Sequence, residues 1–534
     1  MLALCVSVAR HKIRLSRPMR AETEVLGIRS RTPKDAESRA TPAVLNTFMN
    51  RHPWRWGALL LVLLLVASLV RDVRTKMWID ELYTLSMARQ ASAVEIVKAT
   101  LEGADGAPPL YAIVVHVLLP VVRPDALAVR LPATLGFCGM FWCLFAFCLR
   151  RMPAPLAMAT AFLPCVVCEY YSSEGRAYGI VLGCAAGALL SWQAAIDGRR
   201  RTLCLATLAG CLALMCAMHY YAAFFLIPLL VAELVRCRSM RKPDYGMAAA
   251  MAPVALVLGV HYPLIAALRQ FQVHHWSPAA WTQIPRFYTV YLLPMLLLLL
   301  LSVGSIVILR PSSAWGNMPR PNFATHERAA IYTLSLMPVG VVALSVCTAR
   351  PFLDRYILWA VIGLAMLAGS ATCGAARGKA AAGAVMLCGT VGAFIGTEAI
   401  RLSSAPALLE GQAVMDALDR LPDSGEPIVV ADHHVFMELS YYSQPRIRTR
   451  LIYPVNAKLD LQYLNFDTGA LLMAALRRRT KLHIENYNVV LDGNPRFLLA
   501  ATPHDYLPRH FRSLGYQVVP IDPGAQQLVF EVSQ

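Results

Sequence analysis

The stretch Tyr288–Leu309 reads YTVYLLPMLLLLLLSVGSIVIL, 22 residues without a charged side chain. A membrane-spanning helix needs about 20 consecutive apolar residues, within a range of about 17–25. Backbone amide and carbonyl groups inside a bilayer must be hydrogen-bonded within the protein, so a helix is the expected form. The stretch therefore predicts a helix that crosses a membrane.

Ten further apolar stretches precede or follow this segment. The composition agrees with many crossings, because 57% of all residues are hydrophobic and only 16% are charged, against roughly 45–50% and about 25% in soluble domains. The sequence predicts a mainly α-helical, polytopic membrane protein of about 11 spans. The other spans are expected at residues 57–70, 131–149, 154–172, 176–196, 202–217, 220–235, 247–268, 329–347, 356–373 and 380–398.

Basic residues cluster at alternate ends of these stretches. Lys and Arg are enriched in the cytoplasmic connections of membrane proteins, so the clusters and the basic N-terminal segment are predicted to be cytoplasmic and the C-terminus to be external. The net charge of +17 comes largely from these clusters, which argues against a nucleic-acid-binding surface. The clusters are Arg150 and Arg151, Arg199 to Arg201, Arg236 to Lys242, Arg310 to Arg328, and Arg377 with Lys379.

Residues 108–122 form an apolar run of only fifteen residues, PPLYAIVVHVLLPVV. A crossing there would place the Arg150 cluster outside, so the run is expected to form a helix at the outer surface. It lies within a long first external loop, residues 71–130, of a transmembrane domain that covers residues 55–400. Residues 1–50 are polar and basic, and a disordered segment is expected there.

From about residue 403 the chain has the pattern of a water-soluble domain. Strand-like and helix-like segments alternate, which predicts a small extracytoplasmic α/β domain over residues 403–534. It contains neither a cysteine nor a GxGxxG or P-loop motif, so nothing indicates a disulfide or a nucleotide. The strands are expected at residues 427–431, 449–453, 516–521 and 527–532, and the helices at residues 435–442 and 470–481.

Six short polar clusters interrupt the apolar pattern, and all fall on the predicted external side. Their co-location predicts one composite site. The paired carboxylates Asp80 and Glu81 suit general-base or ion-binding chemistry when partly desolvated, although acidic residues are also common where helices begin. The clusters are Trp78-Ile-Asp-Glu81, Ala107-Pro-Pro-Leu-Tyr111, Arg130-Leu-Pro132, Tyr170-Tyr-Ser-Ser-Glu-Gly-Arg-Ala-Tyr178, Met218-His-Tyr-Tyr221 and Arg350-Pro-Phe-Leu-Asp-Arg-Tyr356.

In this order the clusters resemble the bacterial branch of the dolichyl-phosphate-mannose–protein mannosyltransferase superfamily. These are GT-C fold glycosyltransferases of the family 39 kind, and the resemblance covers residues from about 55 to 400. It implies a mannosyltransferase-like hexosyl- or pentosyltransferase in the bacterial inner membrane. The enzyme would move a sugar from a polyprenyl-phosphate donor to a glycan, lipid or protein acceptor on the non-cytoplasmic side.

The resemblance also implies roles for three acidic residues. Asp80 would be the base that activates the acceptor, and Glu81 would be its companion. Glu174 would be the second external acid, which supports the base or holds a divalent metal ion together with Asp80.

The donor-binding residues follow from the same motifs. Arg350 and Arg355 would bind the lipid phosphate, since the planar guanidinium matches phosphate oxygens. Arg176, Tyr178, His219, Tyr220 and Tyr356 would line the donor cavity.

The chain departs from the resembled pattern at two positions. Ala107 stands where many relatives have histidine, so any role of that histidine is lost or passes to a group such as His116. Gly175 stands where alanine is commoner, a difference expected to be harmless. The His274-His275 pair could ligate a metal, although it also reads as an interfacial cluster with Trp276.

Two other function classes compete with an enzyme. A polytopic secondary transporter also has about this many spans and polar residues at membrane level. The charged residues cluster at one face rather than at the midplane, and no repeated half with interrupted helices is evident, which counts against it. A structural or sensor protein built on the external domain would not need Asp80 and Glu174.

Overall fold

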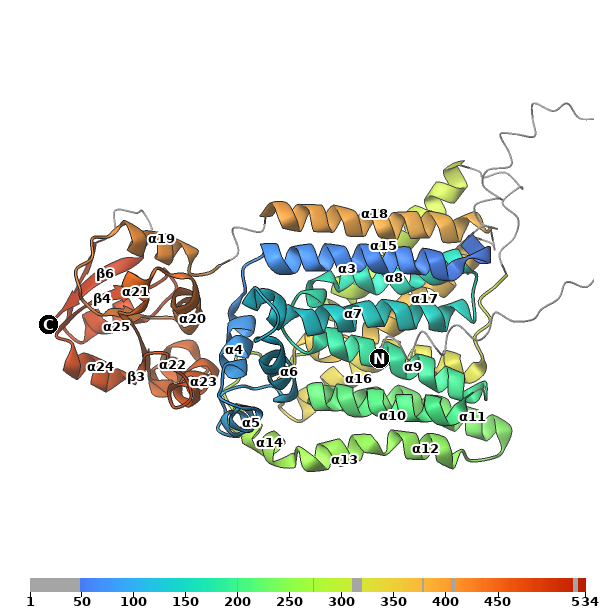
Figure 1. Cartoon of the computed structure of the whole chain (residues 1–534), viewed down its shortest axis with the longest axis horizontal. Coiled ribbons are helices and arrows are strands. Elements are labelled where there is room, and N and C mark those ends of the chain that lie inside the picture. Colours follow the sequence, from blue (N-terminus) through green and yellow to red (C-terminus); the bar gives the residue numbers. More distant parts are fainter. Residues whose placement is uncertain are drawn as a thin grey trace, which may run out of the picture.

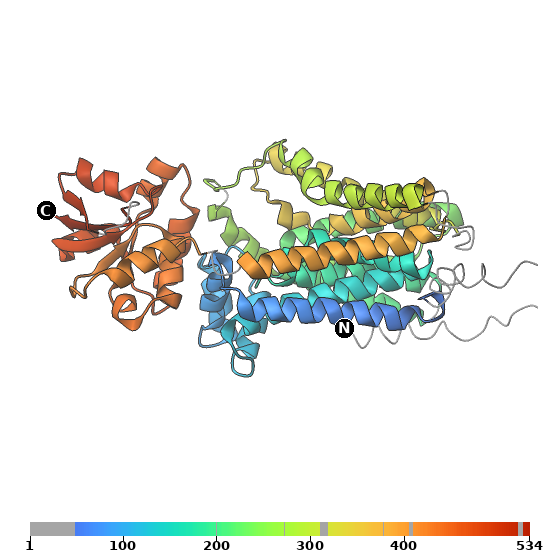
Figure 2. The same cartoon turned by 90° about the horizontal axis from the view of Figure 1, so that it is seen from above.

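The computed structural model of the chain describes residues 49–198, 200–271, 273–309, 319–376, 379–404, 409–521 and 527–534. The disorder expected for residues 1–50 falls almost entirely outside these ranges. A bundle of long helices carries an α/β domain at one end (Figure 1). The view from above has the same two parts in succession along the long axis (Figure 2).

Every stretch that was predicted to cross the membrane is helical. The bundle consists of long helices that run side by side and of the short helices α12, α13 and α14, which follow one another in the chain (Figure 1). They are α3 (Pro53–Arg74), α7 (Asp125–Leu149), α8 (Ala154–Val167), α9 (Tyr178–Ile196), α10 (Arg201–Met218), α11 (Leu226–Met240), α12 (Tyr245–Met251), α13 (Pro253–Val260), α14 (Tyr262–Ala267), α15 (Gln283–Leu309), α16 (Thr325–Cys347), α17 (Ala360–Ala375) and α18 (Ala381–Ser404).

Length and composition alone identify eight of these helices as membrane-spanning within the described residues, and the bent unit Tyr245–Val260 with Tyr262–Phe271 makes nine. The other two of the eleven predicted spans are α8 and α17, apolar helices of 14 and 16 residues. Nearly all side chains of α8 are buried, and it packs against α7, α17 and α18. The 3-10 turns η1 (Glu169–Ser172) after α8 and η5 (Asp354–Ile357) before α17 lengthen these two units.

Helices α7 and α9 form the tightly packed centre of the bundle. A Cβ atom at Gly179 would lie 2.2 Å from the carbonyl oxygen of Ala133, and one at Gly183 would lie 2.3 Å from that of Gly136. Small residues spaced four apart allow such close approach of helix backbones in membranes. The contact fixes Arg130 on α7 beside the loop that leads into α9.

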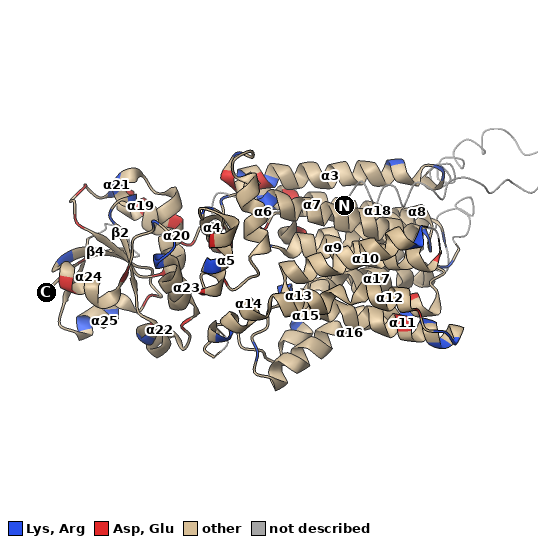
Figure 3. Cartoon of the chain, turned by 60° about the horizontal axis from the view of Figure 1, so that its bottom comes forward, with Lys and Arg blue, Asp and Glu red and all other residues tan. Residues whose placement is uncertain are grey.

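Charged residues gather at the two ends of the bundle, and few lie between them (Figure 3). At the end away from the α/β domain, described side chains of the predicted cytoplasmic clusters form ion pairs. There Arg151 pairs with Glu327 at 2.7 Å, and Arg236 pairs with Asp244 at 2.6 Å. The apolar belt between the two charged ends has the form expected for a membrane protein.

Three short helices lie between the bundle and the α/β domain: α4 (Ile79–Ala88), α5 (Ala93–Leu101) and α6 (Leu110–Leu118). Helix α6 has nine residues, too few to cross a membrane. The apolar run at residues 108–122 therefore forms a short helix at the end of the bundle, in agreement with the sequence prediction.

The α/β domain contains a six-stranded sheet of order β3-β2-β1-β4-β6-β5. Strands β3, β2, β1 and β4 are parallel, and β6 runs antiparallel to both β4 and β5. All four predicted strands and both predicted helices are present, whereas β3 and β4 were not predicted. The elements are β1 (Ile428–Val430), β2 (Leu451–Val455), β3 (Ile484–Asn486), β4 (Arg496–Ala500), β5 (Gln517–Pro520), β6 (Val529–Ser533), α19 (Gln412–Arg420), α20 (His433–Tyr442), α21 (Pro445–Arg448), α22 (Ala457–Leu464), α23 (Thr468–Arg477), α24 (Tyr487–Gly493) and α25 (Leu507–Ser513).

The α/β domain is attached to the short helices by specific polar contacts. Arg479 donates to Glu95 and to Glu102, each at 2.8 Å. The hydroxyl of Tyr442 accepts a hydrogen bond from the backbone amide of Met77 at 2.6 Å, and α20 packs against α4. These contacts hold the domain directly over the residues that begin α4.

Candidate active site

Asp80 and Glu81 are adjacent in the first turn of α4, and their side chains point in different directions. Glu81 points into the protein, where its carboxylate accepts hydrogen bonds from Nε and Nη2 of Arg130, both at 2.6 Å. It also accepts from the backbone amides of Gly175 at 2.8 Å and Trp78 at 3.1 Å. Glu81 is buried, so its geometry favours a positioning role over the catalytic role implied by the resemblance.

Asp80 faces the other way and contacts two arginines. Its Oδ1 lies 3.2 Å from Nη2 of Arg176, and its Oδ2 lies 2.9 Å from Nη1 of Arg355. Arg176 is held in turn by Asp105 at 3.0 Å. Burial alone would raise the pKa of Asp80, but Arg176 and Arg355 outweigh it and hold that pKa below its usual value. The aspartate is therefore ionised at neutral pH.

Glu174 contacts the same nitrogen of Arg355 as Asp80 does. Its Oε1 is 3.5 Å from Nη1 of Arg355, the nitrogen that also contacts Asp80. Burial raises the pKa of Glu174 to about 8, and the attraction of Arg355 only partly opposes this. The structure thus brings together two acids that are 94 positions apart, and it places an arginine between them.

Arg355 is fixed by aromatic rings as well as by acids. It belongs to the 3-10 turn η5 (Asp354–Ile357), and its guanidinium carbon lies 5.8 Å from the ring centres of both Trp78 and Tyr178. Such cation–π contacts hold a guanidinium in place without neutralising its charge. Arg350, its predicted companion, is exposed and forms no ion pair within the described part of the chain.

A cavity of about 460 Å³ opens beside Arg355, among α10, α14, α16 and the 3-10 turn η2 (Tyr220–Phe225). Its walls include Phe224, Ile265, Leu268, Phe271 and Leu344, and the predicted residues Arg176, Tyr178, His219, Tyr220, Arg350, Arg355 and Tyr356 all line it. The cavity is therefore largely apolar with three arginines along it.

The aromatic residues of this cavity form a connected group. The ring centre of His219 lies 5.1 Å from that of Tyr356 and 5.6 Å from that of Tyr178. Burial lowers the pKa of His219 to about 3, so the imidazole is neutral and acts here as part of the wall. Tyr220 is turned toward α13 and contacts His261 at 3.3 Å.

A second cavity, of about 1150 Å³, lies between the bundle and the α/β domain. Asp80, Tyr83, Trp276 and Arg355 line both cavities. The far wall of the larger cavity consists of side chains from the α/β domain, among them Asp432, His433, Asp460 and Asp505. Asp80 and Arg355 therefore stand where the smaller cavity beside the bundle helices meets the larger cavity under the α/β domain.

No family model and no curated protein matches the chain. Two solved structures of ArnT from Cupriavidus metallidurans match it over 89% of this chain and 97% of theirs. The apo structure has a TM-score of 0.53 at 13% identity, and the structure bound to undecaprenyl phosphate has a TM-score of 0.52 at 14% identity. The chain has the GT-C fold. The fold expected from the six sequence motifs is thus confirmed.

The geometry does not favour a metal ion between Asp80 and Glu174. Both oxygens of Asp80 contact arginines, and Nη1 of Arg355 occupies the space between Asp80 and Glu174. Within the described residues, one group of three side chains has the spacing of metal ligands, namely Glu410, Asp432 and His434 in the α/β domain.

The histidines singled out in the sequence lie outside any such group. His116 contacts the backbone carbonyl of Ala88 at 2.8 Å and lines neither cavity. His274 lies 3.6 Å from Asp467 of the α/β domain, and the ring of His275 stacks on Trp276. These contacts favour the interfacial interpretation of the His274-His275 pair.

Glycine at position 175 allows a close approach that the commoner alanine would not. A Cβ there would lie 2.3 Å from Cγ1 of Val129 and 3.1 Å from Oε1 of Glu81. Both neighbours are buried, and the Val129 side chain is β-branched, so it has little freedom to move aside. The glycine lets the loop carrying Glu174 and Arg176 approach α4.

We therefore expect Gly175→Ala to lower transfer activity and to destabilise the protein by about 1–3 kcal/mol, the usual cost of overpacking. The substitution should push the loop away from Glu81 and shift both neighbouring site residues. Thermal unfolding and turnover of the purified protein check this. Gly139→Ala is the control, since a Cβ there meets nothing within 4 Å; equal behaviour of the two variants would contradict the prediction.

Proposed function

We propose that the chain is a membrane glycosyltransferase that moves a hexosyl or pentosyl group from a polyprenyl-phosphate donor to an acceptor on the non-cytoplasmic side. One observation carries this proposal: Asp80 and Arg355 line both cavities. A transfer reaction needs two substrates to meet at one point, and these two residues stand where the two cavities meet.

The smaller cavity suits the donor. Its apolar side chains would pack against isoprene units, and Arg176, Arg350 and Arg355 supply positive charge for the phosphate. Guanidinium groups bind phosphate oxygens through paired, charge-assisted hydrogen bonds. ArnT from Cupriavidus metallidurans, which shares the fold, has been solved with undecaprenyl phosphate bound, and this supports a polyprenyl carrier here.

The proposed reaction is a displacement at the anomeric carbon. An acceptor hydroxyl or amine loses its proton to Asp80 and forms the new bond to that carbon, while the bond to the phosphate oxygen breaks. Polyprenyl phosphate leaves with the electron pair, and its negative charge is met by Arg355 and Arg176. When the phosphate shares the charge of Arg355, less of that charge stabilises ionised Asp80, so its basicity rises with the donor in place.

Glu174 would keep Arg355 available to the donor. As a neutral acid at pH 7 it leaves the arginine one negative neighbour, Asp80, rather than two. Glu81 would act indirectly, because its bonds to Arg130 and Gly175 hold α4 against the loop that carries Glu174. We propose no metal ion in this mechanism.

The pH dependence of donor binding tests the role of Glu174. The charged groups that face it are Arg355, Asp80, Arg176 and Glu81. An acid whose pKa is raised to about 8 is protonated below that pH and ionised above it. We therefore expect the donor KM to rise as the pH increases through about 8, since a second carboxylate then neutralises Arg355.

Glu174→Gln should remove this rise and should keep most of the activity at pH 7, because glutamine mimics the neutral acid. Initial rates at several donor concentrations between pH 6 and pH 9 provide the measurement. A rise that persists unchanged in the variant would show that another group titrates.

The orientation of the chain in the membrane is inferred from the distribution of its basic residues. We propose that the N-terminus and the Arg151–Glu327 end are cytoplasmic and that the α/β domain is external, as in a bacterial inner membrane protein. A secondary transporter is the other candidate. Helix α4, which carries Asp80, lies at one end of the bundle (Figure 1), whereas transporter sites lie near the midplane.

A transfer assay separates the two candidates. Purified protein in lipid nanodiscs would be given radiolabelled polyprenyl-phosphate hexoses and pentoses with envelope glycans, lipids and proteins as acceptors. We expect label to move to one acceptor class and free polyprenyl phosphate to accumulate. No transfer from any donor, together with substrate flux in proteoliposomes, would favour the transporter.

A further inference from the structure

The sheet of the α/β domain has a crevice where its strand order reverses. From β1 the chain continues to β2 on one side, whereas β4 lies on the other side of β1. In open sheets of parallel strands, the connections leave such neighbours in opposite directions, so a crevice forms at their carboxyl ends and serves as a ligand site. Here those ends continue into Asp432-His433-His434 after β1 and into Thr502 to Tyr506 after β4.

This crevice opens toward the candidate active site. Asp432, His433, Asp505 and Tyr506 line the same 1150 Å³ cavity as Asp80 and Arg355. A molecule held by the two loops would therefore extend its far end to Asp80. The crevice position and the shared cavity are independent observations, and both indicate a ligand between the domain and the bundle.

The charges of the two cavity walls differ. Among the described lining residues, the α/β wall contributes Glu410, Asp432, Asp460 and Asp505 together with His433, His434 and His504 but neither lysine nor arginine. The bundle wall contributes Arg286 and Arg355, which pair with Asp354 and Asp80. Carboxylates repel a phosphate or another anion and accept hydrogen bonds from hydroxyl and ammonium groups. Tyr453, Phe466 and Tyr506 add flat apolar rings to this wall, against which the C–H face of a sugar can pack.

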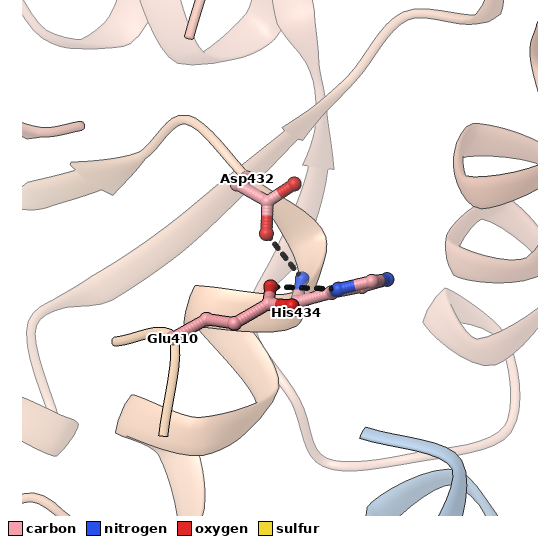
Figure 4. Close-up of side chains that lie close together, drawn as sticks. All are labelled: Glu410, Asp432 and His434. Carbon is pink, nitrogen blue, oxygen red and sulfur yellow. Dashed lines mark hydrogen bonds and ion pairs between the residues drawn. The ribbon is translucent and has the colours of Figure 1, made fainter. Parts of the chain in front are cut away.

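The carboxylates are held in place by neighbouring groups. Asp460 accepts from the hydroxyl of Tyr506 at 2.7 Å, and Asp505 accepts from the amide of Thr502 at 2.6 Å. Asp432 caps α20 through the amides of His434 and Val435, at 2.7 and 3.0 Å. Figure 4 shows Glu410 reaching His434 beside this cap, a contact of 2.9 Å that steadies the loop. Fixed acceptors of this kind give a polar site its specificity.

We infer that the crevice of the α/β domain, with Asp432, Asp460 and Asp505, binds the carbohydrate end of the acceptor, and that this end is a neutral or amine-bearing glycan without phosphate. The identification of this glycan as the acceptor rests on the proposed function, whereas the binding of the glycan does not depend on sugar transfer. The bound sugar presents one hydroxyl to Asp80, which takes its proton as the oxygen bonds to the donor's anomeric carbon and polyprenyl phosphate departs.

A glycan microarray tests this assignment with the full-length protein in nanodiscs and no donor present. The array carries neutral, amino, carboxylated and phosphorylated glycans. We expect binding to neutral or amino glycans, and a decrease of about tenfold or more in the double variant Asp460→Asn/Asp505→Asn, since hydrogen bonds to charged groups are lost. Asp492→Asn, an exposed aspartate of the same domain outside the cavity, should bind like the wild type.

Several results would overturn the inference. These are binding confined to phosphorylated or carboxylated glycans, binding to no glycan, equal binding by the double variant, or a loss on treatment with EDTA, which would assign the carboxylates to a metal ion. A thermal unfolding transition of the double variant like that of the wild type verifies that it folds. Glycan binding without any sugar transfer by the wild type would refute the proposed function and leave the crevice site standing.

Discussion

Asp80→Asn should reduce sugar transfer by about 10²–10⁴, the usual effect of removing a general base. The asparagine keeps the size of the side chain and can still accept one hydrogen bond from Arg176 or Arg355, but it cannot take a proton. Donor binding should persist or become tighter, because Arg355 then has one negative neighbour fewer. Single-turnover transfer and undecaprenyl phosphate binding, measured on the same preparation, check both expectations.

The chain offers a matched control for this substitution. Asp125 is also held by two arginines, Arg89 at 2.6 Å and Arg123 at 2.5 Å, at the same end of the bundle, but it lines neither cavity. Asp125→Asn should leave transfer nearly unchanged. Full activity of Asp80→Asn would disprove the proposed mechanism without affecting the assignment of the GT-C fold.

Arg355→Ala should weaken donor binding by about 1.5–3 kcal/mol, the value of a charge-assisted hydrogen bond, which corresponds to a Kd about 10-fold to 150-fold higher. The arginine contacts Asp80 and Glu174 and lines both cavities. The fold should survive, because Glu174 is neutral at pH 7 and leaves no second buried charge. Arg355→Lys should recover part of the affinity, since it restores the charge without the planar fork.

Arg286 is the control for the effect of Arg355 on donor binding. It lines the larger cavity and pairs with Asp354 at 3.4 Å, but its side chain is 72% exposed and does not line the smaller cavity. Arg286→Ala should leave the donor Kd within about twofold, in keeping with the small effect of an exposed ion pair. If Arg355→Ala behaves in the same way, Arg355 is an interfacial anchor and the phosphate is bound elsewhere.

The bundle could be predicted from the sequence because its signals are local. Runs of apolar residues and alternating basic clusters specify helices and their directions without knowledge of the packing, so all eleven helical stretches and the short α6 were found. The co-location of Asp80, Glu174, Arg176 and Arg355 could also be inferred, since each follows or precedes a predicted span on the same side.

The different directions of the Asp80 and Glu81 side chains could not be predicted from the sequence. Successive residues of a helix point about 100° apart, so one carboxylate faces the cavity and the other faces Arg130, and the choice depends on the packing of α4. The same holds for Gly175, whose importance arises from Val129, a residue 46 positions earlier in the chain.

Part of the α/β wall of the larger cavity could have been predicted from the sequence. Asp432-His433-His434 follows the predicted strand at residues 427–431 directly, and polar residues at the carboxyl end of a parallel strand are candidates for a ligand site. The neighbour that completes the crevice, β4, is a short strand beginning at exposed Arg496. Because that strand was not predicted, no reversal of strand order could be placed beside Asp432.

The two walls of the larger cavity belong to two separate units, and this has an evolutionary consequence. The groups proposed for bond breaking are embedded in the bundle, where a substitution disturbs many packed neighbours. The opposite wall includes the loops that follow β1 and β4, and such loops accept substitutions and insertions without unfolding the sheet that supports them. Descendants of such an enzyme can therefore acquire new acceptors through changes in two loops, while the machinery that handles the lipid carrier is inherited intact.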